Sequence, residues 1–105
     1  MAKTIISDDG RFEWDEAKNR RNKKKHGFLF DEILEVFDDP AFLEGYDTEH
    51  SKIEDRYYGI GCLSGILYVI VFYTLRSERK RIISARRADN DEQEFYNDYF
   101  KKIKS

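Results

Sequence analysis

The side chains best suited to acid–base chemistry are two histidines, His26 and His50. Histidine changes its charge near neutral pH, so either one can give or take a proton during a reaction. His50 lies just before a predicted strand that carries Glu54 and Arg56. Because these two residues are two apart, we expect both side chains on the same face of that strand. A carboxylate base would then lie beside a guanidinium clamp for a phosphate group.

The last predicted strand offers a second set of polar side chains. Ser84 and Arg86 alternate onto one face of it. We expect Arg81, Ile83 and Ala85 on the opposite face. Arg86 is therefore a candidate for a second phosphate clamp, and Ser84 is a candidate hydrogen-bond donor.

Both groups also have a purely structural interpretation. Lys25 and His26 come directly before Gly27, and positive side chains at the end of a helix interact favourably with the helix dipole. For Glu54 and Arg56 the structural alternative is a cross-strand network of ion pairs on a solvated face, which contributes little to stability. Residue types and spacing leave these alternatives open.

Charge is strongly segregated along the chain, although the formal net charge is only −2. The charged residues of segment 31–55 are all acidic except Lys52, whereas those of two blocks at 18–25 and 76–87 are all basic except Glu78. If the fold brings the blocks together, they form a positive surface for a polyanion. If they point apart, they are two solvated faces. The basic residues of the blocks are Lys18, Arg20, Arg21, Lys23, Lys24, Lys25, Arg76, Arg79, Lys80, Arg81, Arg86 and Arg87.

Local patterns predict a strand and two helices before the only proline, Pro40. Residues 12–14 are expected to form a short strand, and Asp15 to cap the helix that follows. Gly27 is expected to end this helix. In residues 30–37, apolar side chains recur three, four and seven positions after the first, which predicts a second helix.

After Pro40 the pattern changes to the two-residue period of strands. The runs predicted as strands are 41–46, 54–63, 66–74 and 79–86. Short connections between the last three favour antiparallel hairpins. Asp89 and Glu92 have the spacing of a capping box, which predicts a C-terminal helix. The expected fold is α+β, with two N-terminal helices, an antiparallel sheet of about four strands and a C-terminal helix, in a single domain over residues 1–105.

Composition excludes several classes of protein. The single cysteine, Cys62, cannot form an intramolecular disulfide, and no cluster of cysteine and histidine has zinc-ligand spacing. We therefore expect neither a bound metal nor another cofactor. No apolar run is long enough for a signal peptide or a membrane span. We expect a cytoplasmic protein without membrane association.

Short motifs also recur at the spacing of one known family. They are Phe12-Glu13-Trp14-Asp15, Lys25-His26-Gly27, Asp47 with His50-Ser51, Glu54 and Arg56, Ile60-Gly61, Tyr73-Thr74 with Arg76, Arg81 to Arg86 with Ala88, and Glu92 with Tyr96. Together they resemble BrnT-type toxins of type II toxin–antitoxin systems. One departure is Leu29, where members of the family tend to have a serine at the N-cap of the second helix.

The resemblance implies a RelE-like fold, cleavage of RNA without a metal ion, and a BrnA-type antitoxin that binds both the toxin and DNA. A metal-independent ribonuclease needs a base for the 2′-hydroxyl, positive charge at the phosphate and an acid for the leaving oxygen. With this resemblance, the catalytic candidates are His26, His50, Glu54, Arg56 and Arg86. The candidates for RNA binding are Lys25, Arg76, Arg79 and Ser84. Which of the histidines and Glu54 is acid or base stays open, as does a dimeric state within the toxin–antitoxin complex.

Two other classes of function compete with this hypothesis. The first is a non-catalytic module that binds a protein or a nucleic acid through its basic surface. The second is a DNA-binding regulator, which is less favoured because the sequence contains neither a helix-turn-helix pattern nor a zinc finger.

Overall fold

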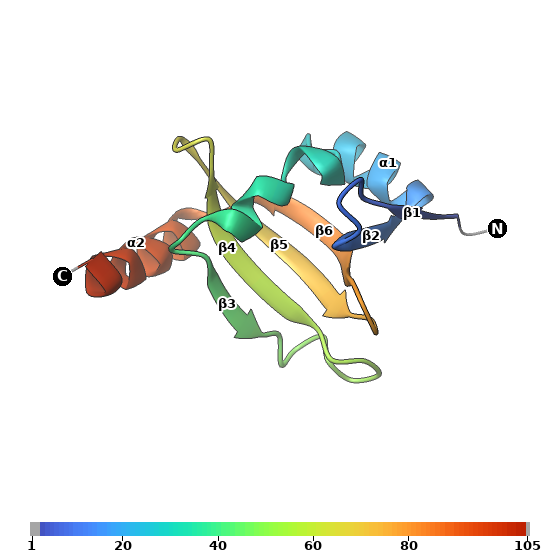
Figure 1. The fold of residues 1–105 in the computed structure, drawn as a ribbon. Coiled ribbons are helices and arrows are strands. Elements are labelled where there is room, and N and C mark those ends of the chain that lie inside the picture. Colours follow the sequence, from blue (N-terminus) through green and yellow to red (C-terminus); the bar gives the residue numbers. More distant parts are fainter. Residues whose placement is uncertain (1–2, 105) are drawn as a thin grey trace.

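The computed structural model describes residues 3–104, and these form an α+β structure around one six-stranded sheet (Figure 1). The elements are β1 (Thr4–Ile6), β2 (Phe12–Asp15), α1 (Glu16–His26), the 3₁₀ helices η1 (Phe30–Glu32) and η2 (Leu34–Asp38), β3 (Leu43–Tyr46), β4 (Tyr57–Leu63), β5 (Leu67–Leu75), β6 (Lys80–Arg87) and α2 (Asn90–Lys104). The strand order is β1-β2-β6-β5-β4-β3. η1 and η2 pack on one core, and α2 packs on a second.

The sheet is larger than predicted and is mixed. β3, β4, β5 and β6 form the expected antiparallel meander, and β2 confirms the short strand expected at residues 12–14. β2 pairs in parallel with β6, and β1 pairs antiparallel with β2. This parallel pair joins segments near the two ends of the chain, which a local periodicity does not report.

Helix α1 begins and ends as predicted. The Asp15 side chain accepts a hydrogen bond from the backbone N–H of Lys18 at 2.9 Å, and Gly27 adopts the left-handed conformation at φ 87°. Asn22 is buried on this helix. Its side-chain amide bonds the backbone C=O and N–H of Ala85 at 2.9 and 3.0 Å. α1 thereby covers the part of β6 that lies beyond its pairing with β2.

The helix predicted from Phe30 onward is not an α-helix but the two 3₁₀ turns η1 and η2. Its fully buried side chains, Phe30, Ile33 and Val36, recur every third residue, which is the period of a 3₁₀ helix. Leu29 provides no side-chain cap, and its backbone N–H donates to the Glu32 carboxylate at 2.7 Å instead. The apolar pattern therefore located the segment but not its helix type.

Strand β4 begins at Tyr57, later than predicted, so Glu54 and Arg56 lie in a loop. The N–H of Arg56 donates to the Ser51 hydroxyl at 2.8 Å, and its C=O accepts from the N–H of Asp47 at 2.8 Å. These bonds close the loop on itself before the β-ladder starts. The expectation that Glu54 and Arg56 share one face of a strand is therefore wrong.

A β-bulge changes the phase of β6. Consecutive residues of β5 pair with Ser84 and then with Ile82, so Ile83 is an extra residue in β6. Ile82 and Ala85 consequently both face the first core, although they are three residues apart. Arg81 lies on the same face as Ser84, which corrects the opposite phase predicted for it.

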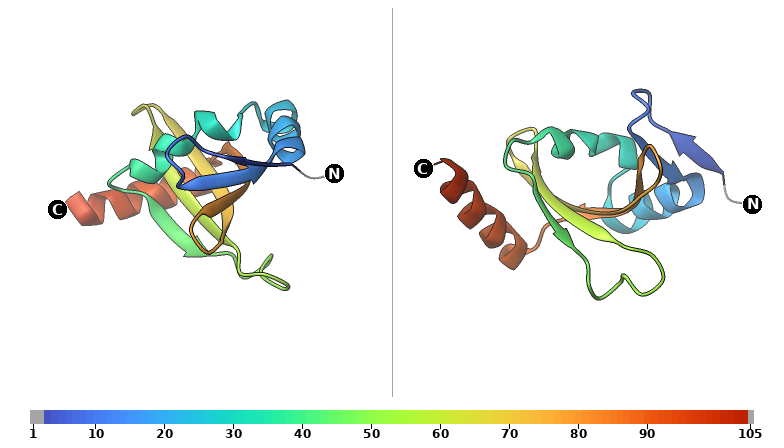
Figure 2. Two further views of the ribbon diagram at one scale, coloured as in Figure 1. Left: turned by 45° about the vertical axis from the view of Figure 1, so that its right-hand side comes forward. Right: turned by 60° about the horizontal axis from the view of Figure 1, so that its bottom comes forward.

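Helix α2 begins with the predicted capping box. The Asp89 N–H donates to Glu92, and the Glu92 N–H donates to Asp89, both at 2.8 Å. Tyr96 anchors the helix, because it is buried in the second core and its hydroxyl donates to Asp39 at 2.6 Å. Beyond this anchor, the helix runs outward from the sheet (Figure 2).

Candidate active site

An open cavity of about 430 Å³ lies where the loop between β3 and β4 meets the end of β5. Three residues predicted to act in catalysis, His50, Glu54 and Arg56, line it together. Arg76, predicted to bind substrate, forms an ion pair with Glu54. The lining is completed by Glu49, Lys52, Ile53 and Thr74.

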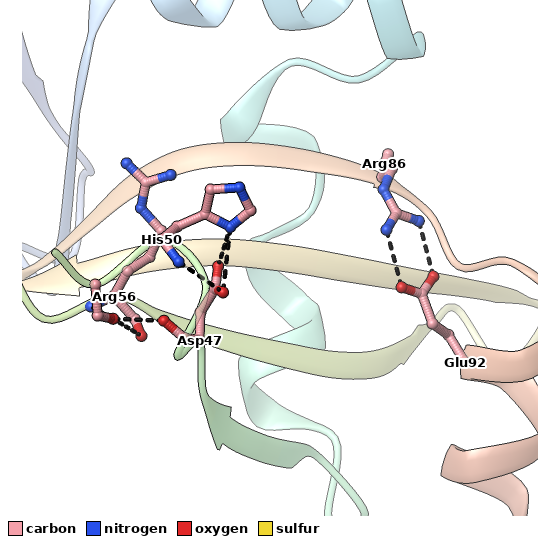
Figure 3. Close-up of polar contacts among 6 residues, drawn as sticks. Asp47, His50, Arg56, Arg86 and Glu92 are labelled. Atoms are coloured by element: carbon pink, nitrogen blue, oxygen red, sulfur yellow. Dashed lines mark hydrogen bonds and ion pairs between the residues drawn. The ribbon is translucent and has the colours of Figure 1, made fainter.

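The loop holds His50 against a carboxylate. Nδ1 of His50 lies 3.0 Å from Oδ2 and 3.2 Å from Oδ1 of Asp47 (Figure 3). The Asp47 side chain is 10% exposed, whereas the His50 side chain is 55% exposed. An ionised carboxylate only accepts hydrogen bonds, so Nδ1 carries the proton in this contact. Nε2 is then the nitrogen that can exchange a proton with a bound molecule, which suits His50 to general acid–base chemistry.

Arg56 is fixed through its backbone by the same loop. The Ser51 hydroxyl accepts the Arg56 N–H and donates to the Asp47 C=O at 2.5 Å. One hydroxyl therefore ties Arg56 to the turn that carries His50. Within residues 3–104, no carboxylate lies at ion-pair distance from the Arg56 guanidinium. Its charge is available to a phosphate group.

Thr74 adds a buried polar group to this cavity. Its side chain is almost fully buried, and its hydroxyl has no hydrogen-bond partner among the described residues. A buried polar group without a partner is costly and calls for an explanation. Thr74 lines the cavity, but its hydroxyl is buried beneath the surface, so a bound molecule reaches it only if the lining shifts.

The first basic block forms a second cavity, of about 340 Å³, between α1 and β6. Its lining consists of Lys18, Arg21, Asn22, Lys25, His26, Ile83 and Ser84. The predicted site residues Lys25, His26 and Ser84 thus meet there. Partial burial lowers the pKa of His26, and the charges of Lys25 and Arg86 lower it further. None of the described residues that line this cavity is acidic, so it is suited to hold an anion.

Arg86 lies toward the other end of the sheet from Arg56 (Figure 3). Arg86 pairs with Ile70 of β5, whereas β4 begins beside Tyr73. The rise along the strands and the spacing across them give a backbone separation of roughly 15 Å. The Glu92 carboxylate accepts two hydrogen bonds from Arg86 at 2.7 and 2.8 Å, and this contact raises the pKa of Arg86. The structure therefore does not bring the two predicted clamps together.

Most arginines of the second basic block have acidic partners. The ion pairs are Arg76–Glu54, Arg81–Glu13 and Arg86–Glu92. Arg79, predicted to bind substrate, lines a cleft of about 370 Å³ beside Arg11 and Lys80. The two blocks do meet at α1 and β6, but the unneutralised charge comes mainly from the first block.

Two further findings concern metals and membranes. Among residues 3–104, no three His, Cys, Asp or Glu side chains come together in a group that could hold a metal ion. No helix in the described part of the chain is both long and apolar enough to cross a membrane.

Fold and site together define a class: small α+β proteins with an oriented histidine, a nearby arginine and a cationic cavity. Comparison with known proteins specifies it further. The family model for the ribonuclease toxin BrnT of type II toxin–antitoxin systems matches residues 14–92, and the chain belongs to this family.

A solved structure shares the fold. The crystal structure of the Brucella abortus ribonuclease toxin BrnT is similar with a TM-score of 0.57 and 29% sequence identity. The match covers 73% of this chain and 94% of the Brucella chain. A search of curated proteins finds no match.

Asp47, Ser51 and Thr74 were not predicted as site residues, although all three belong to the motifs that carry the resemblance. The spacing of Asp47 and His50 contained a usable signal. Residues three apart at a turn often contact each other, and an aspartate is a common partner for a histidine. The role of Ser51 depends on the loop closing, and that of Thr74 on its burial, so neither is visible in the sequence.

Proposed function

We propose that the chain is a metal-independent endoribonuclease and that its active site is the cavity lined by His50, Glu54 and Arg56. The observation that carries this proposal is the contact between Asp47 and the His50 imidazole, next to an arginine without an acidic partner. Membership in the BrnT family supports the same reaction class.

These residues provide the three elements that RNA cleavage requires. Glu54 takes the proton from the 2′-hydroxyl, whose oxygen then attacks the adjacent phosphorus. Arg56 stabilises the charge that develops on the phosphorane oxygens. His50 donates a proton from Nε2 to the 5′-oxygen as its bond to phosphorus breaks. The products are a 2′,3′-cyclic phosphate and a 5′-hydroxyl end.

The cationic cavity between α1 and β6 is the second part of the proposal. Lys25, His26 and Ser84 hold phosphates of the RNA strand there, and Arg76 and Arg79 extend the positive surface at the β5–β6 turn. Phosphate binding by several cations releases counterions, so binding must weaken steeply as salt rises. Arg86 has a structural part in this arrangement, because Glu92 occupies its guanidinium.

The two histidines offer a matched test of this division. His50→Gln is expected to abolish cleavage of single-stranded RNA at saturating substrate, whereas His26→Gln is expected to weaken RNA binding and leave turnover close to the parent. Cleavage should persist in EDTA and give 2′,3′-cyclic phosphate ends. Activity that requires magnesium, or products with 5′-phosphate ends, would overturn the mechanism. RNA binding without any cleavage would favour a non-catalytic module instead.

A partner that silences the enzyme completes the proposal. We infer that a BrnA-type antitoxin covers the cationic cavity with an acidic segment, which excludes RNA by competition. Complementary charge accelerates association more than it slows dissociation. Reversal of Lys18, Arg21 and Lys25 to glutamate should therefore lower the association rate strongly at low salt and much less at high salt. Equal losses at both salt concentrations would place the antitoxin elsewhere.

A further inference from the structure

A groove of about 440 Å³ lies on the side of the sheet where α2 packs, between α2 and strands β3 to β5. Aromatic residues contribute much of its wall, namely Tyr46, Tyr58, Phe72 and Phe95. Tyr46 is 46% exposed and Phe95 is 51% exposed. Glu49 and Asp91 add negative charge to the groove. The groove therefore suits a segment that is both apolar and basic.

The outer half of α2 has this composition. Phe100 is 38% exposed and Ile103 is 48% exposed, both on the part of the helix that runs outward from the sheet (Figure 2). The last turns also contain Lys101, Lys102 and Lys104. The first half of the same helix carries Asp91 and Glu92, so its charge changes sign from one end to the other.

We propose that the outer half of α2 docks in the groove of a second copy of this chain. The groove borders the first turn of α2, since Asp91 and Phe95 line it. When two α2 helices lie antiparallel, the basic end of each reaches the acidic groove of the other. The contact is the same on both chains, so it closes with two-fold symmetry into a dimer. The helix dipoles also run in opposite directions, which is favourable.

A second copy fits this groove because one chain carries both complementary surfaces. α2 extends roughly 22 Å, so its basic last turn lies well beyond the residues of its first turns that line its own groove. The family match ends at residue 92, so the outer half of α2 lies outside the part shared with the family model. The dimer does not depend on the proposed ribonuclease activity.

The first test is the molecular mass in solution, measured by sedimentation over a range of concentrations. The parent chain is expected to approach twice its monomer mass as concentration rises. The double variant Phe100→Asp and Ile103→Asp should weaken self-association by roughly tenfold or more. Ile66→Asp is the matched control, because Ile66 is 83% exposed at the β4–β5 turn and lies away from the groove. Circular dichroism verifies that each variant is folded.

The second test exchanges the charges of the two surfaces. One variant carries Glu49→Lys and Asp91→Lys in the groove, and the other carries Lys101→Glu and Lys104→Glu on the helix. Each alone should be monomeric where the parent dimerises, and an equimolar mixture should form a heterodimer, because acid and base again face each other.

Three outcomes would overturn the dimer. They are a parent chain that sediments as a monomer at every concentration, an Ile66 control that loses association as fully as the double variant, and mixed charge variants that fail to associate. If the parent stays monomeric and an antitoxin binds through this groove, the occupant is the partner protein and not a second copy.

Discussion

Replacement of Asp47 by Asn tests the acid–base pair most directly. The Asp47 carboxylate holds Nδ1–H of His50 at 3.0 Å, and its side chain is only 10% exposed. A hydrogen bond to a charged group contributes about 1.5–3 kcal/mol. At 1.36 kcal/mol for each factor of ten in rate, loss of this bond lowers kcat by roughly 10- to 150-fold. Asparagine keeps the shape of the side chain, so the loss reports orientation and charge at His50.

The assay is single-turnover cleavage of a short RNA at saturating enzyme, with denaturant unfolding measured in parallel. Glu49→Gln is the matched control, since it removes a neighbouring negative charge from the same loop without contact to the imidazole of His50. It should change the rate little. The role assigned to Asp47 is refuted if Asp47→Asn cleaves at the parent rate. It is also refuted if Glu49→Gln loses as much activity, because net charge would then explain both results.

Three further predictions concern charge, packing and pH. Arg56→Ala should lower the cleavage rate by about a hundredfold or more and leave the stability unchanged. Arg86→Ala should mainly lower the stability. Unfolding and cleavage assays of both variants will distinguish these outcomes. Asn22→Ala should cost about 2–4 kcal/mol of unfolding free energy in denaturant titrations, because the two backbone groups of Ala85 lose their partners while buried. The folded pKa of His26 lies below its ordinary value of 6.5, so the unfolded chain takes up the proton first. The contribution of neutral His26 to the free energy of unfolding is therefore complete above pH 6.5 and falls as the pH drops below this value. The variant His26→Gln should lose less stability than the parent between pH 7 and 5, as denaturant unfolding at each pH will measure.

Features specified by neighbouring residues were predictable from the sequence. The caps at Asp15 and Gly27 depend on hydrogen bonds within a turn of helix, and the capping box of Asp89 and Glu92 spans three residues. The antiparallel meander also follows from short connections between apolar runs. In each of these cases the pattern that predicts the structure lies within a short segment of the sequence.

Features that depend on distant contacts were not predictable in this way. The strand expected at Glu54 starts later, because the Ser51 hydroxyl binds the backbone of Arg56 and closes a loop. Arg81 lies on the face of the sheet opposite to the predicted one, because the β5–β6 ladder contains a bulge. His50 and Arg56 could be identified as site residues from their residue types. The distance between Arg56 and Arg86 could not be predicted, because it depends on the register of three strands.

Asp47 connects the active site with the groove beside α2, because it binds His50 and also lines that groove. A lysine brought to this groove by a second copy competes with Nδ1–H of His50 for the same carboxylate. Dimerisation should therefore lower turnover, and the loss cannot exceed the factor found for Asp47→Asn. Specific activity is expected to fall over the concentrations at which the mass doubles, and to stay constant for the variant with Phe100→Asp and Ile103→Asp. Constant activity in a chain that does dimerise would show that the docked lysines do not reach Asp47.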